Sequence, residues 1–196
     1  RSTLFPYTTL FRSQNEQKRL IKFIANNEIF NSYFSTDLNL FTIPLRRYLD
    51  NKFSVEKRFQ LFQNNLQVIS KKFTPQMLRL LCSGNRVVFL QFGLFSVGIE
   101  ANSICKTEGL WAIAIRDHFD RLVYQLTFSY ADRETILIGS LQGVNSSGLD
   151  VQEISKEITR LTFGLRPTTL CLSALQSLCD ATGINNLLAV RTSSIG

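Results

Sequence analysis

The hydrophobic periodicity changes near Arg86, and this change constrains the fold more than any other feature of the sequence. From Val55 to Phe73 the apolar residues follow at intervals of four, three, four, three and four positions, which places them on one stripe of a helix. After Arg86 the apolar runs are short, rich in β-branched and aromatic residues, and separated by polar turns, as in strands. We therefore predict one α+β domain with a helical part at 14–85 and an α+β core at 86–196.

Capping residues mark where the predicted helices begin. Ser54 suits the N-cap of the helix that carries the apolar stripe, because its hydroxyl can accept a hydrogen bond from a free N–H of the first turn. Thr74 and Pro75 have the order of an N-cap followed by a proline in the first helical position. Upstream, 16–34 is predicted to be helical.

The core at 86–196 begins with four predicted strands, at 87–95, 110–116, 122–130 and 135–142. Apolar residues alternate along 122–130, so one face of this strand is expected to be buried. The short polar loop at 117–120 predicts an antiparallel hairpin.

Two helices and a strand are predicted to complete the core. Asp150 and Glu153 have the spacing of a capping box, which starts the first helix. The second is expected at 168–182, ending at Gly183, and a strand at 187–190 follows. The predicted architecture is thus N-terminal helices, then a mostly antiparallel sheet with the two C-terminal helices packed on it.

The first thirteen residues, RSTLFPYTTLFRS, resemble the in-frame translation of a widely used sequencing-library adapter. We expect 1–13 to be adapter-derived and not native, and we exclude them from the fold. Without Arg1 and Arg12, the 22 basic residues become 20 against 15 acidic ones, so the net charge falls from +7 to +5. This mildly basic chain, with acidic residues interspersed, predicts no nucleic-acid partner.

Other features bound the cellular context. The longest apolar stretch, at 87–99, is interrupted by polar residues and glycines and is too short for a membrane span. Four cysteines without a Cys-x-x-Cys pair favour a reduced cytoplasmic setting and predict no metal site. The only histidine, His118, falls in the predicted hairpin loop, where we expect an exposed turn residue without a catalytic role.

Several stretches resemble the VirK/YbjX family of bacterial proteins. They are PLRRYLDNKFSVEKRFQLF at 44–62, EGLWAIAIRDHFDRLVYQLTFSY at 108–130, ILIGSLQG at 136–143 and EITRLTFGLRPTTLCLSALQSLCDATGINNLLAVR at 157–191. The last stretch is the most specific, because it combines a Gly-Leu-Arg-Pro turn, an apolar helix closing on Gly-Ile, and a short strand. Family members continue further, so the resemblance implies a fragment that is incomplete at its C-terminus and leaves a sheet edge unpaired.

The resemblance implies a stress or virulence-associated protein linked to envelope integrity, with no settled enzymatic activity. We expect a non-enzymatic protein without a cofactor, cytoplasmic or peripheral to the inner membrane, whose partner is another protein or the inner-membrane surface. The basic pairs Arg46-Arg47, Lys57-Arg58 and Lys71-Lys72 could face anionic lipid, although a solvated helix surface is the default explanation.

The alternative is an acetyltransferase-like enzyme. The strand, helix and strand from Ile136 to Val190 resemble the core of that fold, and Arg166 precedes a helix whose start could hold the pyrophosphate of an acyl-CoA. Pro167 argues against this reading because proline has no N–H to donate. Arg166 could instead fix the turn or pair with a nearby carboxylate. Glu108 and Gln142, at the ends of predicted strands, are further candidate cleft residues, and backbone capping explains them as well.

Overall fold

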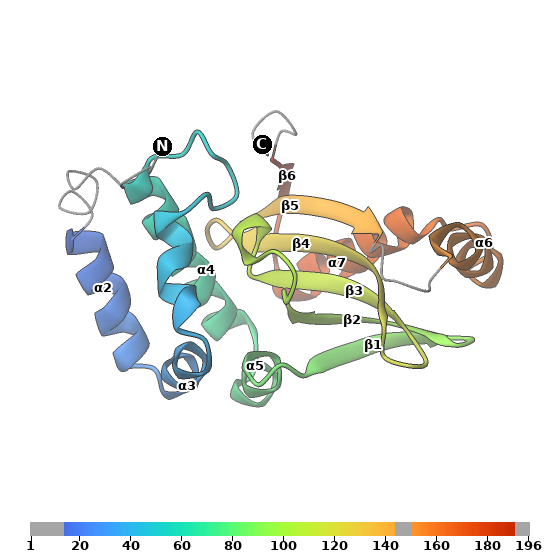
Figure 1. Cartoon of the computed structure of the whole chain (residues 1–196), viewed down its shortest axis with the longest axis horizontal. Coiled ribbons are helices and arrows are strands. Elements are labelled where there is room, and N and C mark those ends of the chain that lie inside the picture. The colour runs from blue at the N-terminus through green and yellow to red at the C-terminus, as the bar shows by residue number, and fades with distance from the viewer. Residues whose placement is uncertain (1–13, 144–149, 191–196) are drawn as a thin grey trace, which may run out of the picture.

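The computed structural model describes residues 14–143 and 150–190. The prediction that 1–13 are not native therefore concerns residues outside the described part of the chain. Figure 1 shows the N-terminal helices on one side of a twisted sheet, α7 behind the sheet, and α6 at its opposite end. This arrangement confirms the α+β class, with helices first and a mostly antiparallel sheet after them.

The N-terminal part is helical but is divided differently from the prediction. Its elements are α2 (Gln14–Ala25), α3 (Glu28–Thr36), the 3-10 helix η1 (Leu38–Leu45), α4 (Val55–Lys72) and α5 (Pro75–Cys82). The region predicted to be helical at 16–34 consists of two helices, because Asn27 has an extended backbone and its side chain accepts from the N–H of Phe30, starting a new helix. Folding the chain back there lets α2 and α3 both pack on the core.

The capping residues of α4 and α5 act as predicted. The side-chain oxygen of Ser54 accepts from the N–H of Lys57 at 3.2 Å, and that of Thr74 accepts from the N–H of Met77 at 3.3 Å. The apolar stripe of α4 is buried, with Phe59, Phe62 and Leu66 almost inaccessible to solvent.

The described residues form one six-stranded sheet in sequential order. Its strands are β1 (Arg86–Phe92), β2 (Phe95–Ala101), β3 (Trp111–Asp117), β4 (Leu122–Tyr130), β5 (Thr135–Gly143) and β6 (Asn186–Ala189). All neighbours are antiparallel except β5 and β6, which are parallel. The one strand predicted at 87–95 is wrong, because Gly93 takes a positive φ of 51° and turns the chain into a β1–β2 hairpin.

Both faces of β4 are buried, although alternation predicted only one. Phe128 and Tyr130 point into the main apolar core, which also holds Trp111. On the opposite face, Thr127 and Ser129 are polar and are buried under the segment that joins β2 to β3, which includes the 3-10 helix η2 (Lys106–Glu108). This segment is why a polar strand face is hidden from solvent.

The C-terminal helices are α6 (Val151–Leu161) and α7 (Pro167–Thr182). Both helices were predicted from the sequence. Asp150 caps α6 by accepting from two backbone N–H groups, and Gly183 ends α7 in the left-handed conformation. α7 packs against β3 and β4, whereas α6 packs against α7. The crossover through both helices brings β6 beside β5 in parallel.

Candidate functional site

The edge of the sheet formed by β1 and β2 presents two unlike surfaces on its two faces. Successive side chains of a strand point to opposite faces, so Arg86 and its register partner Glu100 lie on one face. Val87 and its partner Ile99 lie on the other. The first pair lines a charged cleft and the second pair lines an apolar groove.

The apolar groove lies between α5, β1 and α7 and encloses about 520 Å³. Its walls are almost entirely apolar and include Phe73, Met77, Val87, Phe89, Leu90, Ile99, Leu170, Ala174, Leu178 and Ala181. A volume of this order suits a small apolar ligand or a length of hydrocarbon chain.

A β-bulge in the edge strand β1 shapes the groove. Val88 pairs with Gly98 and Leu90 pairs with Val97, so Phe89 is an extra residue with no partner on β2. The bulge lets Phe89 and Leu90, although consecutive, both line the groove. Gly98 permits the close approach, because a Cβ there would lie 2.7 Å from the carbonyl oxygen of Val87.

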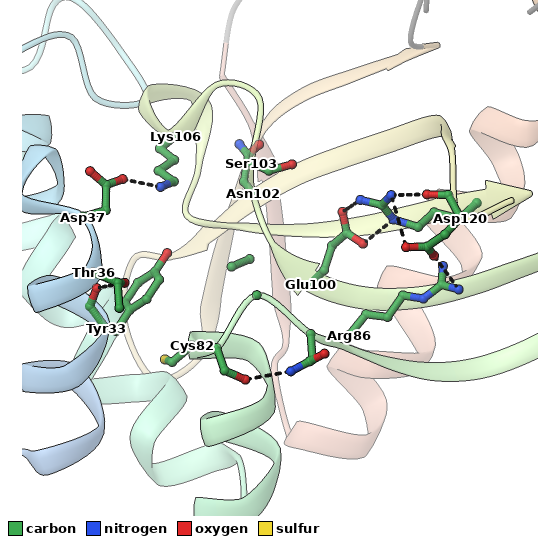
Figure 2. Close-up of a pocket in the computed structure, with 15 residues that line it drawn as sticks. Tyr33, Thr36, Asp37, Cys82, Arg86, Glu100, Asn102, Ser103, Lys106 and Asp120 are labelled. Atoms are coloured by element: carbon green, nitrogen blue, oxygen red, sulfur yellow. Dashed lines mark hydrogen bonds and ion pairs between the residues drawn. The ribbon is translucent and has the colours of Figure 1, made fainter.

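The charged cleft lies between α3, the turn from α5 into β1, and the segment after β2, and it encloses about 440 Å³ (Figure 2). Its charged groups come in ion pairs. Arg116 makes a two-pronged contact with the buried carboxylate of Glu100, with both N–O distances 2.8 Å. Arg86 contacts the exposed carboxylate of Asp120 at 2.9 Å, and Lys106 contacts Asp37 at 2.6 Å.

Two uncharged groups complete the inner end of the cleft. Tyr33 is only 6% exposed, and its hydroxyl is buried without a hydrogen-bond partner among the described residues. Burial, with the nearby Cys82 and Asp37, raises the pKa of Tyr33, so the hydroxyl remains a donor at neutral pH. Burial also raises the pKa of the Cys82 thiol to about 12.

The hydrogen bond from Lys106 lowers the pKa of Asp37, which keeps that carboxyl ionised.

The three predicted site residues lie on three different elements. Arg166 is an exposed N-cap of α7 and makes no side-chain capping bond. Gln142 is exposed near the end of β5, beside Gln125 of β4. Glu108 ends η2, and its backbone oxygen accepts a hydrogen bond from the hydroxyl of Thr127. No hydrogen bond or ion pair joins any two of the three in the part of the chain that the structure describes.

The structure also places the histidine and two of the cysteines considered in the sequence. His118 is exposed in the β3–β4 turn, as predicted. Cys171 and Cys179 are buried in α7 and free, and none of the described residues forms a cluster of three or more potential metal ligands. The sequence did not single out Tyr33, Arg86, Glu100 or Arg116. A charged residue inside an apolar strand is a signal that could have identified Glu100. The sequence does not predict β2 as a separate strand, so this signal is not visible in it.

The family profile described as a protein of unknown function, DUF535, matches residues 4–195. The chain belongs to this family. DUF535 is the same family as VirK/YbjX, so the resemblance seen in the sequence is confirmed. No solved structure matches the chain.

Relatives with known sequences say little about activity. A protein named membrane protein LapB from Mannheimia haemolytica is 30% identical over 147 residues, covering 74% of this chain and 62% of that protein. Two uncharacterized proteins of Haemophilus influenzae are 25% and 29% identical over 186 residues each, covering 92% of this chain and 62% and 61% of theirs. The chain thus spans about three fifths of the length of these curated relatives. Within the described residues, no helix is long and apolar enough to cross a bilayer.

Proposed function

We propose that this DUF535 protein is a non-enzymatic envelope factor that works peripherally at the cytoplasmic surface of the inner membrane, where the groove between β1 and α7 takes an acyl chain of a lipid. The stress and virulence links of the VirK/YbjX family are consistent with a role in envelope integrity. The observation that carries the proposal is the groove itself, an open apolar cavity in a small domain.

The exposed apolar residues of the β1–β2 hairpin, two of which line the groove, favour lipid as the occupant. Val88, Phe89 and Leu90 are three consecutive exposed apolar residues on an edge strand, and Leu94 is exposed at the tip of the same hairpin. Soluble domains rarely leave such apolar patches uncovered, so this edge suits contact with a membrane or another apolar partner. The excess of basic over acidic residues favours the anionic lipids of a bacterial membrane surface. The name of the Mannheimia relative, membrane protein LapB, agrees with this setting.

Vesicles of phosphatidylglycerol and phosphatidylethanolamine are expected to bind the protein, and Phe89→Ser to weaken that binding by roughly three- to tenfold. Burying a whole phenylalanine side chain stabilises a complex by roughly 1.5–3 kcal/mol, and about half of this applies to Phe89, which is 47% exposed. A change of about 1.4 kcal/mol corresponds to tenfold in affinity. Co-sedimentation over a range of lipid concentrations measures the effect. Phe119→Ser is the matched control, because Phe119 is also exposed (66% against 47% for Phe89) but lies in the β3–β4 turn.

A second variant separates binding of an acyl chain in the groove from nonspecific hydrophobic adsorption to the vesicles. Ser177 lines the groove and is exposed, so Ser177→Phe should fill the cavity while adding apolar surface. If the groove takes an acyl chain, Ser177→Phe lowers vesicle binding. Unchanged or stronger binding by this variant, or equal losses for Phe89→Ser and Phe119→Ser, would remove the groove from the explanation.

A second candidate function is the acetyltransferase-like enzyme with an acyl-CoA cofactor. The observation that favours it is the single parallel strand pair among the described strands, β5 and β6, joined through α6 and α7. Arg166 would contact the anionic part of the cofactor at the start of α7, where its side chain is exposed. Pro167 is the first residue of α7 and offers no N–H, which weakens this candidate.

Acetyl-CoA at millimolar concentration tests the enzyme candidate through the unfolding midpoint. A ligand present at about 100 times its Kd stabilises the native state by roughly 2.7 kcal/mol, which raises the midpoint by several degrees. Arg166→Ala should abolish that rise, whereas Arg160→Ala, an exposed arginine of α6 paired with Glu157, should preserve it. A midpoint that does not respond to acetyl-CoA counts against the enzyme.

A further inference from the structure

We propose that the charged cleft beside α3 is a binding site for a small zwitterionic molecule that carries both an amino group and a carboxylate, such as a free amino acid or a dipeptide. The cleft lies on the opposite face of the β1–β2 edge from the apolar groove. The inference therefore goes beyond the proposed membrane function, and either one can fail without the other.

The unpartnered hydroxyl of Tyr33 indicates that the cleft has a ligand. A buried hydroxyl without a hydrogen-bond partner costs roughly 1–3 kcal/mol, so a purely structural position would favour phenylalanine. The aromatic ring is already accounted for by packing, since it lies 6.5 Å from the ring of Trp111 and 5.9 Å from that of Phe34. The hydroxyl does none of this packing. Figure 2 shows it pointing into the cleft toward Asp37 and Lys106.

The balance of charge decides the chemistry of the ligand. Three cations and three carboxylates line the cleft: Arg86, Arg116, Lys106, Asp37, Glu100 and Asp120. A site for phosphate or another strong anion would have an excess of cations, because phosphate recognition relies on Arg and Lys that are free to bind it. Charges of both signs in equal number instead fit a ligand that itself carries both signs.

One end of the cleft is suited to a carboxylate. Asp120 is the partner of Arg86, and it is 69% exposed on a turn where its φ is +62°. It is therefore the most easily displaced carboxylate of the set, because leaving the ion pair returns it to water. A ligand carboxylate that replaced it would meet Arg86 first and Arg116 beside it. Arg116 lies 4.0 Å from the Asp120 carboxylate and also donates to the Asp120 backbone oxygen at 2.6 Å. Glu100 stays on Arg116 from the buried side.

The other end is suited to an amino group. Asp37 is half-buried and is kept ionised by Lys106, whose hydrogen bond lowers the pKa of that carboxyl. A ligand ammonium could share the Asp37 carboxylate with Lys106 and also donate to the oxygen of Tyr33, which lacks a partner. The cleft volume of about 440 Å³ is large enough for a dipeptide.

Isothermal titration of the full chain with L-alanyl-L-alanine tests the proposal. Binding is expected to weaken at least tenfold when the amino end is acetylated or the carboxyl end is amidated. Tyr33→Phe should weaken binding by about three- to tenfold without lowering the unfolding midpoint of the free protein, since it removes an unpaired group. Tyr124→Phe, a half-buried tyrosine outside the cleft, should bind as the original chain does.

A second variant checks the carboxylate end. Arg86→Gln should weaken binding at least tenfold, whereas Arg160→Gln, which also breaks an ion pair but lies on α6, should not. No binding of free alanine or of the dipeptide would overturn the proposal. Equal binding of the acetylated and free dipeptides, or tighter binding of inorganic phosphate than of either, would overturn it as well. Loss of vesicle binding by the Phe89 variant has no bearing on this result.

Discussion

Gly139→Ala is expected to destabilise the protein by at least about 3 kcal/mol, an upper-range cost for adding a methyl group to a packed interior. A Cβ at Gly139 would lie 1.5 Å from the carbonyl oxygen of Glu108, closer than any non-bonded contact. That oxygen belongs to backbone and cannot rotate away. The segment around η2 would have to leave β5, which exposes the polar face of β4 beneath it.

The local hydrogen bonds show why this segment cannot simply shift. The hydroxyl of Thr127 donates to the oxygen of Glu108 at 3.1 Å and accepts from the N–H of Ser140 at 2.9 Å. Gly139 is the extra residue of a bulge, because Thr127 pairs with Ser140 and Phe128 pairs with Ile138. Moving the carbonyl therefore also breaks its hydrogen bond from Thr127, whose hydroxyl accepts from Ser140 beside the bulge.

Urea unfolding followed by circular dichroism measures the effect of Gly139→Ala. A cost of about 3 kcal/mol corresponds to a fall of roughly 6–12 °C in the thermal midpoint for a chain of this size. Gly84→Ala is the control, because Gly84 has a φ of +80° but nothing within 4 Å of its would-be Cβ. It should cost only roughly 1–2 kcal/mol of backbone strain, less than Gly139→Ala. A Gly139 variant as stable as the original chain would show that η2 does not rest on β5.

Asn65→Leu is expected to cost roughly 2–6 kcal/mol. The side-chain oxygen of Asn65 accepts from the indole N–H of Trp111 at 3.1 Å and from the backbone N–H of Tyr130 at 2.8 Å. All three residues are fully buried. A leucine of similar size fills the space but leaves two donors without partners, each at a cost of roughly 1–3 kcal/mol.

A neighbouring residue supplies the control for Asn65. Asn64 on the same helix donates to the oxygen of Ala131 at 2.8 Å in a half-buried position, so Asn64→Ala should cost about 1 kcal/mol. Adding Trp111→Phe to Asn65→Leu should cost less than the two changes measured separately, because the indole N–H is then absent. Strict additivity, or equal effects at Asn64 and Asn65, would mean that the Asn65 oxygen does not hold β3 and β4 to α4.

Local chemistry explains which elements the sequence could predict. The caps at Ser54, Thr74 and Asp150 each satisfy N–H groups within three residues, so the sequence alone contains the whole interaction. Strand β4 was predicted with its observed bounds because its alternation is long and uninterrupted. The two missed boundaries, at Asn27 and Gly93, are short breaks inside longer apolar patterns, where periodicity outweighs a single residue.

By itself the sequence determined the helical N-terminal part, the mostly antiparallel sheet, the two C-terminal helices and the family. Only the tertiary structure decided where ligands could bind. The apolar groove needs β1 and α7, whose lining residues Phe89 and Leu170 are far apart in the chain. The charged cleft brings Tyr33 of α3 beside the Asp37–Lys106 pair, whose members are 69 positions apart. Contacts over such separations depend on how whole elements pack, and no short-range pattern in the sequence encodes them.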